Sequence, residues 1–530
     1  MTASLPTVGE FVRARADDTR PALHSEGGTW TWAEHTAEAA ARAAWYASRR
    51  PTDGRPPHVG VLLENVPEYS FWLAAAAVGR FVLVGLNPTR SPEALAADVV
   101  ATQCDLVLTD RPELIGSVEI DVLDPHSISY PPAQLPPDPA GPGDLYLLIF
   151  TSGTTGQAKA VKCSQGKIAM MAIGLTMAVD LTDKDTTYLS MPLFHSNAVI
   201  TNWAPALAVG ASIGLKRKFS ASSFLEDCRQ LNATYANYVG TPLSFVLAQP
   251  PRPDDADNPL VRVFGNEGAP ADLERFAQRF DCRVIDGFGS TEGGISITRT
   301  PDTPPGSLGR GVGDIAVVTH DGTECPAAVF DDQGRLLNAD EAVGELVNRD
   351  GGQFFEGYWN APEDEAHRRR RGWYWSGDLG YRDAAGFLYF AGRSLDRLRV
   401  SGENLTAAPI ARLLTAHPDI VEAAVYAVPD PVAGDQVMAA IEPNDGFDPT
   451  TLPTWIAAQP AAGKHDTPSF LRIGQLPRTA TGKVLVRELA KQSWHGEHVW
   501  IRDADRMRPM TAQDIEALHA RFQASGRTLP

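Results

Sequence analysis

A loop rich in glycine and hydroxyl residues most constrains what this chain can fold into. The apolar run Leu145 to Phe150 predicts a buried strand, and the residues that follow, 151–156, read Thr-Ser-Gly-Thr-Thr-Gly. Glycine at 153 and 156 permits tight backbone turns, the hydroxyls can donate hydrogen bonds, and Lys159 adds a positive charge. These properties suit a phosphate chain, although composition alone would equally allow an ordinary surface loop. The loop lacks the Gly-Lys-Ser/Thr ending of a Walker loop, so it predicts another kind of phosphate site.

The length and the net charge of the chain limit how many domains and which kinds of binding partner we expect. The chain has 530 residues, more than the roughly 250–300 that a single core usually supports, so we expect more than one domain. Its 65 acidic residues exceed its 47 basic ones, and the formal net charge is −18. A globally negative protein is a poor candidate for nonspecific nucleic-acid binding, although it can hold a nucleotide in a local positive pocket. We therefore expect small-molecule partners and no nucleic acid.

The cysteines and apolar segments indicate where the protein works. The 5 cysteines are scattered without metal-binding spacing, which is typical of free thiols in a reducing compartment. Residues 1–20 contain no apolar signal core. The longest apolar stretch, Phe71 to Leu86, is interrupted by Arg80, whereas a membrane span needs about 20 clean apolar residues. It predicts a buried helix followed by a strand, so we expect a cytoplasmic protein without a transmembrane segment.

Strands and helices alternate in the first part of the chain. An edge segment from Phe11 precedes an alanine-rich helix that starts at Thr31-Trp32-Ala33-Glu34. Beyond it the pattern predicts strands at 59–63, 81–86 and 106–108, with helices at 65–78 and 92–100 between them. Such alternation implies a parallel sheet. Near the C-terminus, a helix at 408–416, a strand at 421–428 and an amphipathic helix at 510–524 indicate a small second domain.

Several motifs follow one another in a fixed order. They are the loop 151–159, Pro-Leu-Phe-His at 192–195, Asp286 to Glu292, Gly-Tyr-Trp at 357–359, Ser-Gly-Asp at 376–378 and Pro477 to Lys483. Together they closely resemble the adenylate-forming superfamily, which comprises acyl-CoA synthetases, luciferases and peptide-synthetase adenylation domains. The resemblance covers nearly the whole chain. The segment Ser-Gly-Glu-Asn-Leu at 401–405 looks most like that of fatty-acyl-CoA synthetases.

The resemblance implies an α/β fold with two parts. A large N-terminal domain with several subdomains and parallel-rich sheets would bind AMP and the acyl group at residues 1–393. Residues 394–396 would form a hinge, and a small mobile α+β domain would occupy 397–530. Leu395 stands where the family usually has an Asp or Lys, but a hinge needs only to absorb a backbone rotation.

The resemblance also implies catalytic roles for four residues. Lys483 would neutralise charge that develops during adenylation, and Thr291 would donate a hydrogen bond to the α-phosphate. Glu292 would bind Mg²⁺, a hard cation that prefers oxygen ligands. His195 would shape or gate the acyl pocket, since no second ligand lies at metal-binding spacing from it.

Further residues would hold the nucleotide and CoA by the same resemblance. Asp378 would accept hydrogen bonds from both ribose hydroxyls, and Arg393 would contact ribose or phosphate. The other implied contacts are Thr151, Ser152, Gly153, Thr154, Thr155, Gly156, Lys159, Gly268, Ala269, Pro270, Asp286, Gly287, Phe288, Gly289, Ser401, Gly402 and Glu403.

Three residues differ from those that the family usually has in its motifs, and one arginine cluster lies outside these motifs. Ala158 and Ala160 replace the usual proline and glycine beside Lys159, and Phe288 replaces a tyrosine and so lacks its hydroxyl. Proline would have stiffened the loop before its charged residue, so adenylation could be slowed. The arginine cluster 368–371 is expected to be a solvated face.

The implied reaction has two steps. A carboxylate attacks the α-phosphate of Mg·ATP and releases pyrophosphate, and the thiol of CoA then attacks the acyl-adenylate. Other readings stay open: thioesterification of a preformed adenylate only, loading of a carrier protein, oxygen as the acceptor as in luciferases, and nucleotide binding without turnover. The acyl group is equally open between a fatty acid and a natural-product acid, and the oligomeric state between monomer and homodimer.

Overall fold

Two compact units make up the part of the chain that the structure describes. The computed structural model covers residues 5–49, 55–151, 158–239, 242–266, 268, 270–332, 334, 336–393, 397–400, 403–431, 435–459, 466–479 and 482–525. The first unit comprises residues 1–268, 272–294 and 352–370, and the second comprises 269–271, 295–351 and 371–530. Residues 295–351 and 371–393 thus group with the C-terminal part. The hinge expected at 394–396 lies outside the described residues, and the functional boundary there stays a prediction.

A six-stranded sheet in the first unit carries the strand that enters the phosphate loop. Its order is β6-β5-β3-β4-β7-β8. The strands are β3 (His58–Leu62), β4 (Val82–Gly85), β5 (Leu106–Thr109), β6 (Asp121–Leu123), β7 (Leu145–Thr151) and β8 (Lys159–Ser164). All neighbours run parallel except β8, which returns antiparallel to β7. Every residue of β3, β4 and β5 is buried, which explains their continuous apolar sequences and confirms the predicted parallel sheet.

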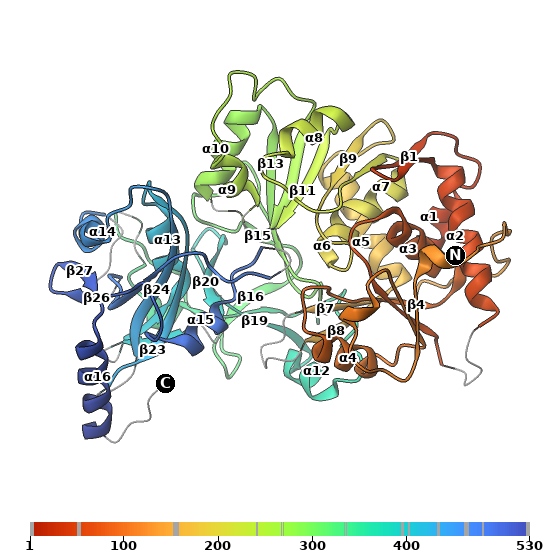
Figure 1. Cartoon of the computed structure of the whole chain (residues 1–530). Coiled ribbons are helices and arrows are strands. Elements are labelled where there is room, and N and C mark those ends of the chain that lie inside the picture. Colours follow the sequence, from red (N-terminus) through yellow and green to blue (C-terminus); the bar gives the residue numbers. More distant parts are fainter. Residues whose placement is uncertain are drawn as a thin grey trace. The chain divides into compact units, whose positions relative to one another are not determined.

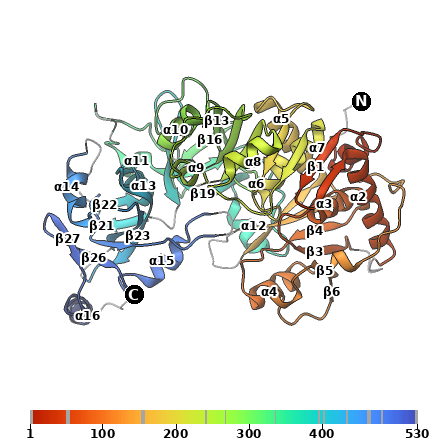
Figure 2. The ribbon, with the colours of Figure 1, turned by 45° about the horizontal axis from the view of Figure 1, so that its top comes forward.

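Helices α3 (Pro67–Gly79) and α4 (Pro92–Ala101) belong to the core around this sheet. Every residue of α3 after Pro67 is buried, so the longest apolar stretch is a core helix followed by β4, as predicted. α4 places Leu95 and Val99 in one core with strand residues such as Val84, and Figure 2 shows it beside β5 and β6. Among the helices of the described ranges, none combines the length and the apolar character that a bilayer crossing requires.

A second sheet of the first unit brings several motif segments to one edge. Its strands in this unit are ordered β13-β12-β11-β9-β10-β1-β2. They are β1 (Pro21–Ser25), β2 (Gly28–Thr31), β9 (Thr186–Leu189), β10 (Ser212–Leu215), β11 (Tyr235–Val239), β12 (Arg262–Asn266) and β13 (Arg283–Gly289). All neighbours are parallel except β2, which is antiparallel to β1. Parallel strands end at the same edge, so the segments after β9, β12 and β13, with His195, Gly268 and Thr291, lie there.

Amphipathic helices cover this second sheet. α8 (Phe224–Leu231), α9 (Pro242–Leu247) and α10 (Pro270–Phe280) lie near β11 and β13 in Figure 1. Phe224, Leu243 and Phe276 from these helices share one core with strand residues such as Val263. The core fixes where the ends of β11, β12 and β13 lie relative to one another.

The N-terminal helices begin at capping boxes. In α2 (Trp32–Ala47) the Thr31 side chain accepts from the Glu34 amide, and the Glu34 carboxylate accepts in return, which confirms the predicted start. A shorter helix, α1 (Val8–Arg13), has the same arrangement at Thr7 and Glu10 and was not predicted.

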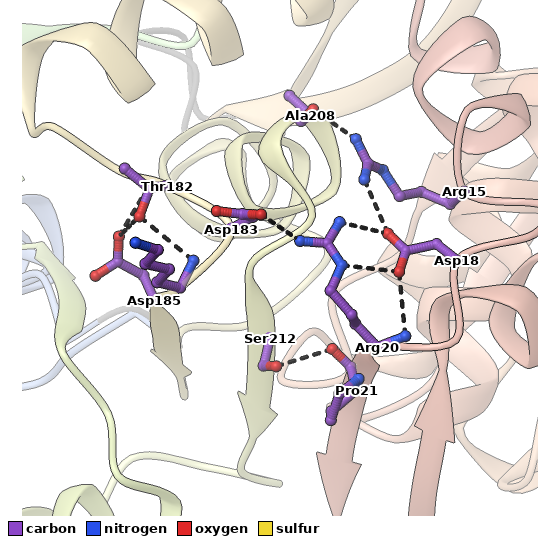
Figure 3. Close-up of polar contacts among 10 residues, drawn as sticks. Arg15, Asp18, Arg20, Pro21, Thr182, Asp183, Asp185, Ala208 and Ser212 are labelled. Carbon is purple, nitrogen blue, oxygen red and sulfur yellow. Dashed lines mark hydrogen bonds and ion pairs between the residues drawn. The ribbon is translucent and has the colours of Figure 1, made fainter.

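An ionic cluster ties the segment after α1 to distant parts of the first unit (Figure 3). Asp18 accepts hydrogen bonds from Arg20 at 2.6 Å and from Arg15 at 2.9 Å. Arg15 also donates to the carbonyl oxygen of Ala208 in α7 (Ala204–Val209), and Arg20 donates to Asp183 at 2.5 Å. The Arg20 hydrogen bonds, and secondarily Arg15, hold the pKa of Asp18 well below its usual value.

The second unit contains two larger sheets and a hairpin. One sheet joins β16 (Ile315–Val318), β17 (Gly344–Asn348), β19 (Trp373–Arg382) and β20 (Leu388–Arg393) in antiparallel order. The hairpin is β21 (Arg397–Val400) with β22 (Glu403–Thr406). The other sheet has five strands in sequence order: β23 (Ile420–Pro429), β24 (Asp435–Pro443), β25 (Phe470–Ile473), β26 (Val499–Asp503) and β27 (Arg506–Pro509).

Separate cores cover the two faces of the five-stranded sheet. Ile410 of α13 (Ala407–Thr415) and Ile456 of α14 (Leu452–Ala457) pack in one core. Leu489 of α15 (Val486–Gln492) and Phe522 of α16 (Ala512–Ser525) pack in the other. The predicted helix at 408–416, strand at 421–428 and final amphipathic helix are therefore confirmed, as is the expected α/β fold with a large N-terminal and a small C-terminal part.

Candidate active site

Thr291 and Glu292 follow β13 and are held by three neighbouring side chains. The Thr291 hydroxyl lies 2.6 Å from the hydroxyl of Ser196, which begins α6 (Ser196–Ala198). Glu292 is 7% exposed, and the Tyr358 hydroxyl donates to its Oε1 atom at 3.0 Å. The buried Lys167 ammonium donates to the main-chain oxygens of Thr291 at 3.1 Å and of Glu292 at 3.2 Å. The hydroxyl and the carboxylate are therefore placed by the fold.

Tyr358, in the Gly-Tyr-Trp run, contacts both Glu292 and Arg368 through its hydroxyl. Burial, and then the charge of Glu292, raise the pKa of Tyr358, so its hydroxyl stays protonated and acts as the donor. The Arg368 Nε atom donates to the same hydroxyl oxygen at 3.3 Å. The expectation that residues 368–371 form a solvated face is therefore wrong for Arg368, because its guanidinium points to a buried tyrosine.

Lys159 lies at the start of β8, opposite Thr151 of β7 in the strand register. Its side chain is 11% exposed and forms an ion pair with Asp364 of α12 (Pro362–Arg368). Its ammonium also lies 5.7 Å from the centre of the Tyr358 ring, within the range of a cation–π contact. The phosphate-loop lysine and the Glu292 carboxylate thus contact the same tyrosine.

Asp286 joins the ends of three parallel strands. Its Oδ2 atom accepts from the Tyr238 hydroxyl at 2.6 Å and from the Gly268 amide at 3.1 Å. The Asn266 side chain donates to the carbonyl oxygen of Gly287 at 2.7 Å. Glycine is required at 265, since a Cβ there would overlap the Tyr238 backbone.

Two of the predicted nucleotide contacts, Phe288 and Gly289, are the last two residues of β13. The Phe288 side chain is half-buried.

His195 stands just before α6, on a segment that Asn65 holds. The Asn65 side-chain nitrogen donates to the Met191 carbonyl oxygen at 2.9 Å, and its side-chain oxygen accepts from the Leu193 main-chain amide at 2.9 Å. Two residues after His195, Asn197 donates to the carbonyl oxygen of Tyr238 at 3.0 Å. The histidine is thus placed near the end of β11, and its role at an acyl pocket stays a prediction.

In the second unit, two residues that were predicted to contact ribose lie opposite each other on neighbouring strands. Asp378 of β19 stands opposite Arg393 of β20 in the register, and the Asp378 amide donates to the Ser376 hydroxyl at 3.0 Å. Lys483 follows a tight hairpin, because its amide donates to the Thr479 hydroxyl at 3.1 Å and its carbonyl oxygen accepts from the Thr479 amide at 2.8 Å. The roles of Asp378 at the ribose and of Lys483 in adenylation stay predictions.

Some predicted residues lie outside the part of the chain that the structure describes. These are Ser152, Gly153, Thr154, Thr155, Gly156, Ala269, Ser401 and Gly402, together with the side chains of Pro270, Arg393 and Glu403. Two described residues at the site, Lys167 and Asp364, were not predicted. Lys167 was a lone cation in an apolar helix, a signal that could have indicated a buried partner. Asp364 lies in an acidic run that carries no such signal.

The residues around Glu292 fit one kind of magnesium site. No group of three or more His, Cys, Asp and Glu residues within the described ranges is arranged to hold a metal ion. Mg²⁺ commonly binds through one or two carboxylates, with phosphate oxygens and water completing its shell. Glu292, fixed at Oε1 by Tyr358, suits that arrangement, in which phosphate oxygens and water supply the other ligands.

Comparison with known proteins identifies the family of this chain. The family model described as AMP-binding enzyme matches residues 11–359, and the model of the AMP-binding enzyme C-terminal domain matches residues 410–483. Among solved structures, the anthranilate CoA ligase AuaEII in complex with anthranoyl-AMP aligns with a TM-score of 0.79 and 21% identity. That alignment covers 92% of this chain and 98% of that one, and at this identity it shows the fold.

Two relatives are similar over nearly their full length. The medium/long-chain-fatty-acid–CoA ligase FadD17 of Mycobacterium marinum is 49% identical, over 94% of this chain and 99% of that protein. The steroid-22-oyl-CoA synthetase of Rhodococcus jostii is 43% identical, over 98% of each. From its motifs, its fold and these matches, the chain belongs to the AMP-binding enzyme family.

Proposed function

We propose that this chain is an AMP-forming acyl-CoA ligase that activates a hydrophobic carboxylic acid. In the first step a carboxylate oxygen attacks the α-phosphorus of ATP, and the bond to pyrophosphate breaks. In the second, the sulfur of CoA attacks the acyl carbon, loses its proton, and AMP leaves. The products are the acyl-CoA thioester, AMP and pyrophosphate.

The observation that carries this proposal is the cluster around Tyr358. It gathers the phosphate-loop lysine, Lys159, and the carboxylate Glu292, with the Thr291 hydroxyl on the adjacent residue. A cation and a hydroxyl can hold phosphate oxygens, and a magnesium ion bound at Glu292 would offset their charge. Lys483 would stabilise the charge that develops on the α-phosphate, and Asp378 would accept from the ribose hydroxyls.

The relatives favour this reaction over the alternatives. FadD17 and the steroid-22-oyl-CoA synthetase are both named as CoA enzymes, which supports CoA over a carrier protein as acceptor. Their names also indicate the substrate class: a medium- or long-chain fatty acid, or a steroid side-chain acid. We infer a cytoplasmic location, because all the cysteines are free thiols.

Turnover with a panel of acids tests the proposal. Octanoate, palmitate and a steroid-22-oic acid would each be incubated with ATP, Mg²⁺ and CoA, with acetate as the small-acid control. We expect a CoA thioester, detected by mass spectrometry, and one pyrophosphate per thioester from at least one hydrophobic acid. ATP–pyrophosphate exchange without any thioester would contradict CoA as the acceptor, and binding of ATP without exchange would contradict an enzymatic function.

A further inference from the structure

Lys159 already has an anionic partner within the first unit. Its ammonium forms an ion pair with the carboxylate of Asp364, and the two side chains are 11% and 28% exposed. Asp364 is the third residue of α12, and 205 positions separate it from Lys159 in the sequence. The contact is therefore a product of the fold and places a negative charge on the cation that the proposed function assigns to phosphate.

The backbone around this ion pair is held firmly. The Trp359 amide donates to the Ala160 carbonyl oxygen at 2.8 Å, and the Lys162 amide donates to that of Gly357 at 3.0 Å. Gly357 has a φ of +90°, and a Cβ there would overlap the Glu365 carboxylate. This close approach of α12 to the Gly-Tyr-Trp run keeps Asp364 against β8.

We propose that Asp364 sets the affinity for ATP by competing with the nucleotide for Lys159. A phosphate oxygen that binds the Lys159 ammonium must displace the Asp364 carboxylate, so part of the binding free energy is used to break that ion pair. The inference rests on the proposed function, in which Lys159 holds phosphate oxygens, and it assigns to Lys159 the β- and γ-phosphates of ATP. AMP lacks both phosphates, so Asp364 weakens binding of ATP and leaves binding of AMP unchanged.

The isosteric substitution Asp364→Asn tests this competition. Dissociation constants for ATP and AMP would be measured by equilibrium titration of the full chain with Mg²⁺ present. We expect ATP to bind about three- to tenfold more tightly, as for release of a partly exposed ion pair, while the AMP constant stays at its wild-type value. Glu363→Gln is the matched control, because it removes the same charge from an exposed neighbouring residue of α12. It should change neither constant.

A double-mutant cycle locates the effect at Lys159. In a Lys159→Met background, Asp364→Asn should no longer change the ATP constant. Unchanged or weaker ATP binding in Asp364→Asn would overturn the inference, as would an equal gain for ATP and AMP. These results are separable from failure of the proposed function, which the absence of thioester formation by the wild-type protein would reveal.

Discussion

At the scale of single residues, the charged groups of the site differ in how the fold holds them. Lys159 is paired with a carboxylate, Glu292 accepts from a tyrosine hydroxyl, and Lys483 is placed by a hairpin. The first two belong to one unit and Lys483 to the other. We therefore expect that substitution of one of these groups can impair adenylation and thioester formation to different extents.

The substitution Lys483→Ala should separate the two half-reactions. Positive charge is needed where negative charge builds during adenylation, so we expect ATP–pyrophosphate exchange to fall by at least about 100-fold. Thioester formation from a supplied acyl-adenylate should stay within about threefold of wild type, since that step does not use this charge. Equal losses in both assays would show that Lys483 has a different role.

At the scale of elements, short local signals determine where helices and strands begin, and long-range contacts hold them. The Thr31 capping box made the start of α2 predictable. α1 carries the same local signal at Thr7 and Glu10 but was not predicted, and part of its support is distant: the Gly9 amide donates to the Gln165 side chain, 156 positions away. The hairpin before Lys483 is held in the same distant way. Arg478 forms ion pairs with Glu422 of β23 and with Glu442 of β24, and donates to the Gly482 carbonyl oxygen at 3.1 Å.

Removing this anchor should impair adenylation more than stability alone explains. Arg478→Gln leaves Glu422 and Glu442 without the cation between them, and burial already raises the pKa of Glu422. We expect pyrophosphate exchange to fall by about tenfold or more, as for a lost charged hydrogen-bond network, with thioester formation from the adenylate largely retained. Arg506→Gln, at an exposed position of β27, is the control and should change neither. Parallel losses of both half-reactions in Arg478→Gln would indicate only a general loss of structure.

At the scale of the whole first unit, polar clusters join segments far apart in the chain. The Arg15–Asp18–Arg20 cluster links the N-terminal segment to Asp183 and to Ala208 of α7 (Figure 3). Asp18 has a pKa below its usual value of 3.8, so it binds a proton less readily in the folded state than in the unfolded one. Its stabilising effect is therefore complete above about pH 5 and is lost progressively as the pH falls below about 4.

Denaturation of Asp18→Asn across this pH range tests the linkage. We expect a loss of about 1–2 kcal/mol in the free energy of unfolding at pH 7, because ion pairs and charged hydrogen bonds with two arginines are lost. The difference from wild type should shrink as the pH falls from 5 to 3. Asp17→Asn changes the same charge at an exposed neighbouring position and should have little effect at any pH. A difference that does not depend on pH would contradict the assigned titration.

The sequence by itself determined the family, the alternation of strands and helices, and most of the candidate site residues. These features are carried by short patterns: the loop 151–159, the motif at 286–292, and the apolar run that becomes α3 and β4. Only the tertiary structure decided which side chains meet. Tyr358 reaches Glu292 across 66 positions, Lys167 reaches Thr291 across 124, and Asp364 reaches Lys159 across 205. Such pairings depend on strand order and register, which are set by burial throughout the unit, so no local pattern at 364 could have indicated its partner.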